Sequence, residues 1–244
     1  MVPSPAPRKL RTVALVGIDG SGKTTQAHRL ADELAAQGLP AAYRRNAGGR
    51  RWFGRLATRF GRRDGEELLG RRLMLFVESL LRWLAILRTL LRRTVTGELT
   101  IMDRYAVCQY ASLRARSGSE RRARLAYRLF PRPDVTFLLA VDPAVAYERI
   151  EARGYDHEEM SFLEAADAAY RSLPERQDFV VIDANGTPDD VAAALQAELA
   201  AWQRWSVPAP RLPAVLAGAR TLLLAGGPLA AGATAIGFRL AEAL

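Results

Sequence analysis

The sequence predicts an α/β fold in which helices flank a five-stranded parallel sheet, with an apolar C-terminal appendage. Short apolar runs alternate with longer segments of helical period, which is the pattern of successive strand, helix and strand units. The runs are apolar at consecutive positions, as in strands that are buried on both faces of a parallel sheet. Together these two observations indicate a sheet that is covered by helices on both sides.

The elements can be assigned in order along the chain. The expected strands lie at 12–17, 40–43, 99–103, 134–141 and 179–183, and the second of them is the weakest. Helical period and end signals predict helices at 23–37, 66–93, 120–130, 144–152, 161–173 and 189–202.

Length and composition indicate one domain of ordinary size with a few dozen residues left over. The chain has 244 residues, of which 49% are hydrophobic and 25% charged. Residues 1–10 are rich in proline and lack the apolar core of a secretory signal, so we expect a disordered lead-in. The domain is expected at 11–204 and the appendage at 205–244.

The appendage is rich in alanine, glycine, leucine and proline. Its stretch 221–238 has no charged residue and is at the lower limit of length for a bilayer span. Gly226, Gly227 and Pro228 in its middle make it a poor membrane helix. Two interpretations stay open, namely membrane contact through 213–238 and packing on the domain or on a second subunit.

Positive charge is concentrated in one part of the chain. The net charge is +9, and every basic residue except Lys9 and Lys23 is an arginine. Such a skew reflects nucleotide composition, so it does not indicate specific binding of nucleic acid. The excess lies within 43–93, which fits either a surface that faces an anionic partner or a solvated helical face. The lone Cys108 excludes an internal disulfide.

A phosphate-binding motif is the strongest functional signal. Gly17, Gly22, Lys23 and Thr24 fit G-x-x-x-x-G-K-[ST], and they lie between an expected strand and an expected helix. Lys23 would reach the β- and γ-phosphates of a nucleotide, and the Thr24 hydroxyl would bind Mg²⁺. The motif therefore predicts ATP and Mg²⁺ as cofactors. The expected nucleotide contacts are Gly17, Asp19, Gly20, Ser21, Gly22, Lys23, Thr24 and Thr25.

Other motifs narrow the class of nucleotide-binding protein. The guanine-reading sequence Asn-Lys-x-Asp is absent, because the only lysines are Lys9 and Lys23. The strand at 99–103 is followed by Arg104, whereas ATP hydrolases commonly have a glutamate there. Both observations point away from GTP-dependent switches and motor proteins.

The strings VGIDGSGKTTQ at 16–26 and MDRY at 102–105 closely resemble those of thymidylate kinases. The resemblance continues through 133–154, 156–173 and 181–186, and it covers about 11–203 in all. It implies the nucleoside-monophosphate kinase fold and transfer of the ATP γ-phosphoryl group to a nucleoside monophosphate, with dTMP as the first candidate. It also implies a homodimer in the cytoplasm, with membrane association through the appendage as the alternative.

The resemblance further implies roles for single residues. Asp19 would lie near the acceptor sugar or its metal, and Asp103 would help Thr24 to organise Mg²⁺. Arg104 would hold the acceptor phosphate. The expected catalytic residues are Lys23, Arg104, Arg149 and Arg153, the expected donor-base contact is Ala184, and the expected acceptor contacts are Asp19, Arg45, Phe76, Arg104 and Tyr105.

This chain departs from the family pattern mostly on the acceptor side. It reads RNAGGR at 45–50 where the family commonly has Arg-Glu-Pro-Gly-Gly-Thr. Phe76 is the aromatic expected to stack on thymine, but Leu80 stands where the family arginine would follow. Two alternatives therefore stay open: a nucleoside or small-molecule kinase with Asp19 or Glu78 as base, and a non-catalytic membrane-associated nucleotide-binding protein. The retained arginines favour an enzyme.

Overall fold

The computed structural model describes residues 10–59, 61–62, 67, 69–154 and 158–206. The folded unit spans Arg8–Arg204. The lead-in expected at 1–10 and the appendage expected at 205–244 lie almost wholly outside the described residues. The membrane contact considered for 213–238 lies outside them as well.

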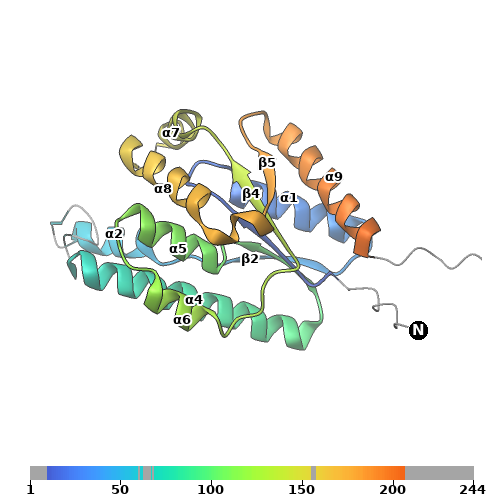
Figure 1. Cartoon of the computed structure of the whole chain (residues 1–244), viewed down its shortest axis with the longest axis horizontal. Coiled ribbons are helices and arrows are strands. Elements are labelled where there is room, and N and C mark those ends of the chain that lie inside the picture. The colour runs from blue at the N-terminus through green and yellow to red at the C-terminus, as the bar shows by residue number, and fades with distance from the viewer. Residues whose placement is uncertain (1–9, 60, 63–66, 68, 155–157, 207–244) are drawn as a thin grey trace, which may run out of the picture. The chain divides into compact units, whose positions relative to one another are not determined.

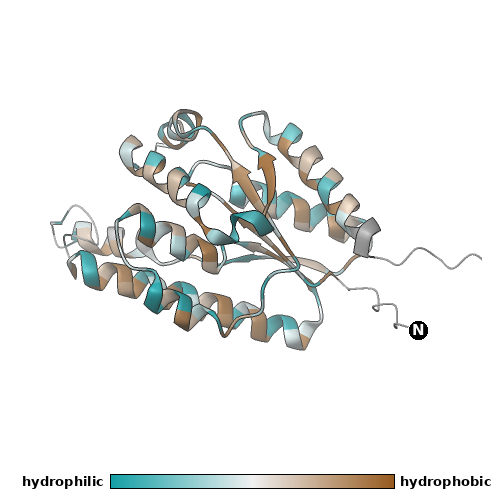
Figure 2. Cartoon of the chain, in the orientation of Figure 1, coloured by the Kyte–Doolittle hydropathy of each residue, from teal (hydrophilic) through white to brown (hydrophobic). Residues whose placement is uncertain are grey.

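A five-stranded parallel sheet forms the centre of the unit, which confirms the predicted fold class (Figure 1). The strand order is β2-β3-β1-β4-β5, so the first strand is central. Figure 2 shows the strands among the most hydrophobic parts of the chain, as expected for strands that are covered on both sides. The strands are β1 (Thr12–Val16), β2 (Ala41–Arg45), β3 (Leu99–Asp103), β4 (Val135–Ala140) and β5 (Val180–Asp183).

Helices cover both faces of the sheet. Helix α1 (Lys23–Ala36) packs on β1, β2 and β3, and α9 (Pro188–Ser206) lies beside α1, where Gln196 hydrogen-bonds Glu33. The opposite layer is formed by helices that contact one another. These are α4 (Arg71–Thr96), α5 (Ala106–Ala115), α6 (Arg121–Tyr127), α7 (Pro143–Glu151) and α8 (Met160–Ser172), and a 3₁₀ turn, η1 (Pro174–Asp178), leads into β5.

Two helices were missing from the sequence prediction. Helix α5 is apolar nearly all round and mostly buried, so it has no polar face from which a helical period could be read. Helix α2 (Arg50–Arg59) is rich in arginine and short of apolar residues. The long helix α4 was expected at 66–93 but begins at Arg71, and it ends at the left-handed Gly97.

The sheet brings the motif residues together at the carboxyl ends of its strands. Because all strands are parallel, their carboxyl ends lie on the same side, where ligands bind in such folds. The phosphate-binding loop, residues 17–24, follows β1, and Arg104 follows β3. The loop at 184–186 follows β5 at the same edge. Segments far apart in sequence therefore meet where the fold predicts a site.

Candidate active site

Lys23 lies at the centre of the phosphate-binding loop and is 5% exposed. Its Nζ donates hydrogen bonds to the Ile18 carbonyl at 2.5 Å and to Ser21 Oγ at 3.2 Å. Burial and the nearby Arg104 lower the pKa of the Lys23 amine to about 8. The amine is thus held inside the loop, at the N-terminus of α1, where a nucleotide phosphate would replace these contacts.

The glycines of the loop allow close packing on its surroundings. Gly20 has φ +83, and a Cβ on it would lie 2.9 Å from the carbonyl carbon of Ala146 in α7. Gly17 has φ +143, and a Cβ there would lie 2.7 Å from the Leu139 oxygen in β4. Gly22 has φ +88 but open space around it. The loop is therefore pressed against β4 and α7, and a side chain would not fit at Gly17 or Gly20.

Asp103, at the end of β3, has one hydrogen-bonded and one unpartnered carboxylate oxygen. Thr24 Oγ1 donates to Oδ2 at 2.6 Å, and the Tyr43 hydroxyl donates to the same atom at 3.3 Å. Burial, with the Asp103 charge, raises the pKa of Tyr43 to about 12, so the phenol keeps its proton. Oδ1 is buried and has no hydrogen-bond partner among the described residues. A carboxylate oxygen beside a hydroxyl oxygen is a donor set that suits Mg²⁺.

Arg104 and Asp19 face each other across the site. The Arg104 guanidinium pairs with Asp19 Oδ1, and Lys23 Nζ lies 3.8 Å from the same oxygen. Burial alone would raise the pKa of Asp19, but the two cations outweigh it and hold the pKa well below its usual value. Asp19 is therefore a charged partner that holds two cations in place. A paired carboxylate of this kind is not suited to act as a general base.

Arg149 of α7 is bound to the loop that follows β5. Its guanidinium donates to the carbonyl oxygens of Ala184, Asn185 and Gly186 at 2.7, 3.0 and 2.9 Å. Arg149 thus contacts the loop expected to hold the donor base. Arg153 is exposed at the end of α7. The neighbouring Asp156 and His157 lie outside the described residues.

The other residues expected to contact the donor nucleotide include Ser21, Thr25 and Ala184. Ser21 is buried at 1% exposure, and Thr25 is exposed in the first turn of α1. Ala184 is fully buried, and its amide donates to the Ala140 carbonyl at 2.7 Å. The backbone of the 184–186 loop is thereby fixed to the end of β4.

Two of the residues expected on the acceptor side point elsewhere. Phe76 is 62% exposed, on the face of α4 opposite its buried residues. Tyr105 turns into the core, and its hydroxyl donates to the Pro131 carbonyl at 2.5 Å. Arg45, at the end of β2, pairs in register with Asp103, and its side chain is exposed. The structure does not bring Phe76 and Tyr105 to the site.

A different set of polar side chains fills the inner face of α4. Glu78 and Arg82 are 2% and 4% exposed, and Arg82 Nη2 donates to Glu78 Oε1 at 3.1 Å. Arg82 Nη1 donates to Gln109 Oε1 of α5 at 2.5 Å. An arginine does therefore follow on α4, but four residues after Glu78. The family pattern places this arginine at position 80, two residues before Arg82. Leu80 occupies that position, and it lies on the outer face of α4.

Two donors in this cluster lack acceptors. Arg82 Nε and Gln109 Nε2 are buried and have no hydrogen-bond partner among the described residues. Buried donors without acceptors are rare and costly, so a water or a ligand atom is expected to accept from them. The signal in the sequence was the pair of opposite charges at Glu78 and Arg82, one helical turn apart within an otherwise apolar segment.

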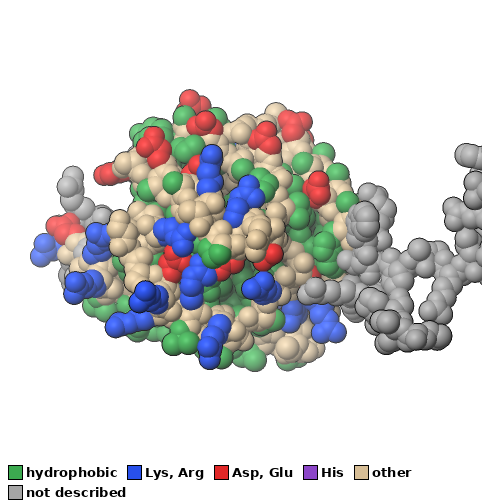
Figure 3. All heavy atoms as spheres, viewed as in Figure 1, with side chains coloured by type: hydrophobic (Ala, Val, Ile, Leu, Met, Phe, Trp, Pro, Cys, Tyr) green, Lys and Arg blue, Asp and Glu red, His purple; other side chains and the backbone are tan. Residues whose placement is uncertain are grey.

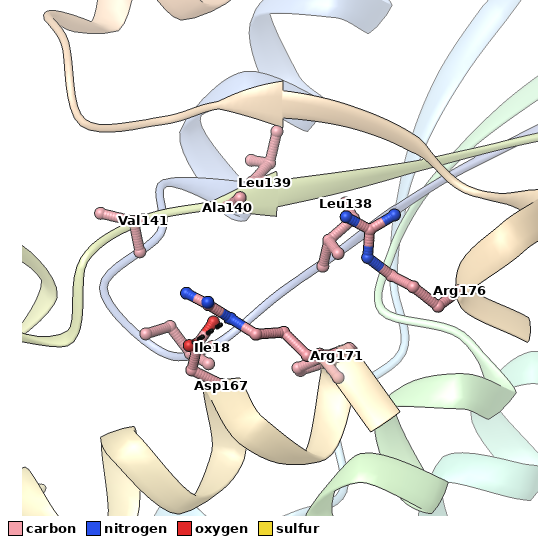
Figure 4. A pocket seen from close by; sticks show the side chains of 9 residues that line it. Ile18, Leu138, Leu139, Ala140, Val141, Asp167, Arg171 and Arg176 are labelled. Carbon is pink, nitrogen blue, oxygen red and sulfur yellow. Dashed lines mark ion pairs between the residues drawn. The ribbon is translucent and has the colours of Figure 1, made fainter. Parts of the chain in front are cut away.

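A separate cavity of about 150 Å³ lies beside the loop (Figure 4). Ile18, Leu138 and Val141 form its apolar side, and Arg176 and the ion pair of Arg171 with Asp167, 2.8 Å apart, form the other. Apart from Ile18, none of the motif residues lines it. The cavity therefore adjoins the phosphate-binding loop at the end of β4, but Lys23, Asp103 and Arg104 do not line it.

Arginines gather on the half of the visible face formed by α4, α5 and α6, and acidic side chains cluster toward α7 and α9 (Figure 3). Among the described residues, no group of histidine, cysteine and acidic side chains is arranged to hold a metal ion without a nucleotide. Within the same part of the chain, the helices are too short or too polar to cross a membrane.

Comparison with known proteins agrees with this geometry. The family model described as thymidylate kinase matches residues 15–195. A probable thymidylate kinase of Pyrobaculum aerophilum is 31% identical over 183 residues, which cover 74% of this chain and 92% of that protein. The thymidylate kinase of Thiobacillus denitrificans is 32% identical over 203 residues, or 77% and 93%. The chain therefore belongs to the thymidylate kinase family and is a phosphotransferase of the nucleoside-monophosphate kinase type.

Proposed function

We propose that this protein transfers the γ-phosphoryl group of ATP to the phosphate of a nucleoside monophosphate, with dTMP as the first candidate acceptor. The observation that carries the proposal is the convergence of two cations on Asp19. Lys23 from the phosphate-binding loop and Arg104 from the end of β3 both contact this one carboxylate. Binding of ATP alone would not require Arg104 at this position.

The chemistry needs little from the protein beyond position and charge. An oxygen of the acceptor phosphate forms a bond to the γ-phosphorus, and the bond to the bridging oxygen breaks to release ADP. Lys23 would bind the donor phosphates, and Arg104 would bind the acceptor phosphate. Thr24 and Asp103 would hold Mg²⁺, which when bound neutralises charge on the donor phosphates. No general base is required, because the acceptor phosphate is already an anion.

The inner face of α4 supports recognition of the acceptor base by hydrogen bonds. Arg82 Nε and Gln109 Nε2 are donors without a partner in the described part of the chain, and they fit carbonyl oxygens or ring nitrogens of a base. Glu78 fixes the Arg82 guanidinium from one side. A stacked ring from Phe76 has no part in this arrangement, because that side chain lies on the outer face of α4.

The proposal is tested by measuring ATP consumption with Mg²⁺ against a panel of nucleoside monophosphates and the matching nucleosides. We expect dTMP to exceed thymidine by at least about 100-fold in kcat/KM, because thymidine lacks the phosphate that Arg104 would bind. The Lys23→Ala protein serves as the blank. Faster turnover of nucleosides would show a hydroxyl acceptor, and ATP binding without turnover of any acceptor would show a non-catalytic protein.

We further propose a homodimer through the outer face of α4. Apolar side chains recur there three, four and seven residues apart, which places them in one stripe along the helix. These side chains are exposed to solvent although they are apolar, whereas Ile86 and Leu90 on the inner face of the same helix are buried. The stripe consists of Leu73, Phe76, Leu80, Leu84 and Leu91, which are 44–62% exposed. A second copy of the chain would cover it.

Replacing Leu84 with glutamate should raise the dimer dissociation constant by about 30-fold or more, because a charge would be buried at the centre of the stripe. Sedimentation velocity at micromolar concentration measures the change. Arg92→Glu is the matched control, since Arg92 is exposed on the same helix but lies outside the stripe. Equal effects of the two substitutions, or a monomeric parent protein, would contradict the proposed interface.

A further inference from the structure

The backbone of Arg104 has an unusual conformation that requires support. Its φ is +75, in the left-handed region that side chains other than glycine seldom adopt. Its amide donates to the Leu15 carbonyl at 3.1 Å, which joins it to the central strand. A residue in this conformation persists only where its surroundings hold it.

Asn46 supplies that support from the residue after β2. It is fully buried, and its Nδ2 donates to the Arg104 carbonyl at 2.8 Å. Its backbone amide donates to the Asp103 carbonyl at 3.0 Å. One residue therefore binds the carbonyl groups of both residues that the site takes from the end of β3.

Thr89 of α4 fixes the Asn46 side chain in turn. It is 2% exposed, and its Oγ1 donates to Asn46 Oδ1 at 3.1 Å. The Arg104 carbonyl can only accept a hydrogen bond, so it must face the Asn46 amide nitrogen, and the amide oxygen then faces Thr89. The orientation of Asn46 is therefore determined by its two partners. Aspartate has the same shape but no donor for the Arg104 carbonyl.

We propose that Asn46, oriented by Thr89, is a positioning residue that holds Arg104 in its left-handed conformation and so aims the guanidinium at the acceptor phosphate. The inference rests on the proposed function in so far as Arg104 binds that phosphate. It explains why an asparagine can occupy this place in RNAGGR at 45–50, since the chain also provides Thr89 as its partner. Within the loop at 17–24, Lys23 is held by the Ile18 carbonyl and Ser21 rather than by Asn46 or Thr89.

The proposed role predicts different kinetic effects for the acceptor and for ATP. Thr89→Val keeps the shape of the side chain and removes its hydroxyl, and Asn46→Asp removes the donor to Arg104. We expect kcat/KM for the acceptor to fall about tenfold in each, mainly through KM, because a small displacement of a binding group is costly. The KM for ATP should change less than twofold. Thr89→Ser, which keeps the hydroxyl, should restore most of the loss.

Thr100→Val is the matched control. Thr100 is also fully buried, but its hydroxyl has no hydrogen-bond partner among the described residues. If Thr89→Val and Thr100→Val lowered activity alike, or if Thr89→Val raised both KM values equally, Thr89 would be merely structural and the proposal would be overturned. If Asn46→Asp fails to fold, the two threonine variants still decide the matter.

A second readout does not depend on turnover. The Nε–H resonance of Arg104, in protein labelled with ¹⁵N-arginine and assigned through Arg104→Lys, reports the environment of the guanidinium. We expect this resonance to shift in Thr89→Val and not in Thr100→Val. A protein that phosphorylates no monophosphate but shows this shift would refute the proposed function and keep the positioning role. An unchanged resonance in an active enzyme would refute the positioning role alone.

Discussion

Replacing Lys23 with alanine is expected to lower phosphoryl transfer by about a thousandfold while the protein stays folded. The ammonium group is buried between Ile18 and Ser21, and it is the only lysine of the described residues. A positioned cation at the transferring phosphoryl group contributes on the order of 100- to 1000-fold or more to kcat. Its loss also removes one of the two cations that pair with Asp19 among the described residues, so the repulsion between Asp19 and incoming phosphates grows.

The measurement is single-turnover transfer with saturating ATP and dTMP. Lys23→Met is the matched control, because it keeps the length and apolar volume of the side chain and removes the charge alone. Both variants should lose activity equally, with unchanged thermal unfolding. Near-normal transfer by either variant would contradict the assigned role, and loss in Lys23→Ala but not in Lys23→Met would assign the effect to packing.

Replacing Gly20 with alanine is expected to destabilise the protein by about 3 kcal/mol, which combines backbone strain with a steric clash. The new Cβ would lie 2.9 Å from two backbone atoms of Ala146 and still closer to its oxygen. Backbone atoms cannot move aside as a flexible side chain can. The loop and α7 would therefore have to separate, and affinity for ATP should fall together with stability.

Gly22→Ala provides the comparison that isolates the clash. Gly22 has φ +88, close to the +83 of Gly20, but nothing lies within 4 Å of its added Cβ. Its cost should be limited to the strain of a left-handed alanine, about 1 kcal/mol. Urea denaturation measures both values. Equal destabilisation by the two substitutions would show that contact with Ala146 does not limit the loop.

The general architecture could be predicted because it depends on patterns that are local in sequence. Buried parallel strands are continuous apolar runs, and the phosphate-binding motif is a contiguous string, so both can be recognised without knowledge of their surroundings. Helix α5 could not be identified in this way, because burial on all sides removes the amphipathic period. The same burial encloses Gln109 of α5, which accepts a hydrogen bond from Arg82.

The acceptor side was harder to predict because it depends on which face of a helix a residue occupies. A shift of two positions along a helix turns a side chain by about 200°, so Phe76 and Glu78 point in opposite directions. The sequence gives the residues of α4 but not the face that meets α5. Asn46 is a related case, since its partners Arg104 and Thr89 lie far away in the chain. Only the fold shows that a polar residue there is fully enclosed.

The position of β2 at the edge of the sheet affects how the protein loses its structure. This strand pairs with β3 only, whereas β1 is enclosed by β3 and β4. Edge elements open at lower free energy than the centre of a sheet. Tyr43 and Asn46 belong to this edge, while Lys23 follows the central strand. Partial opening at β2 would withdraw Asn46 from the Arg104 carbonyl and Tyr43 from Asp103, while the Lys23 contacts to Ile18 and Ser21 on the central strand's loop would persist.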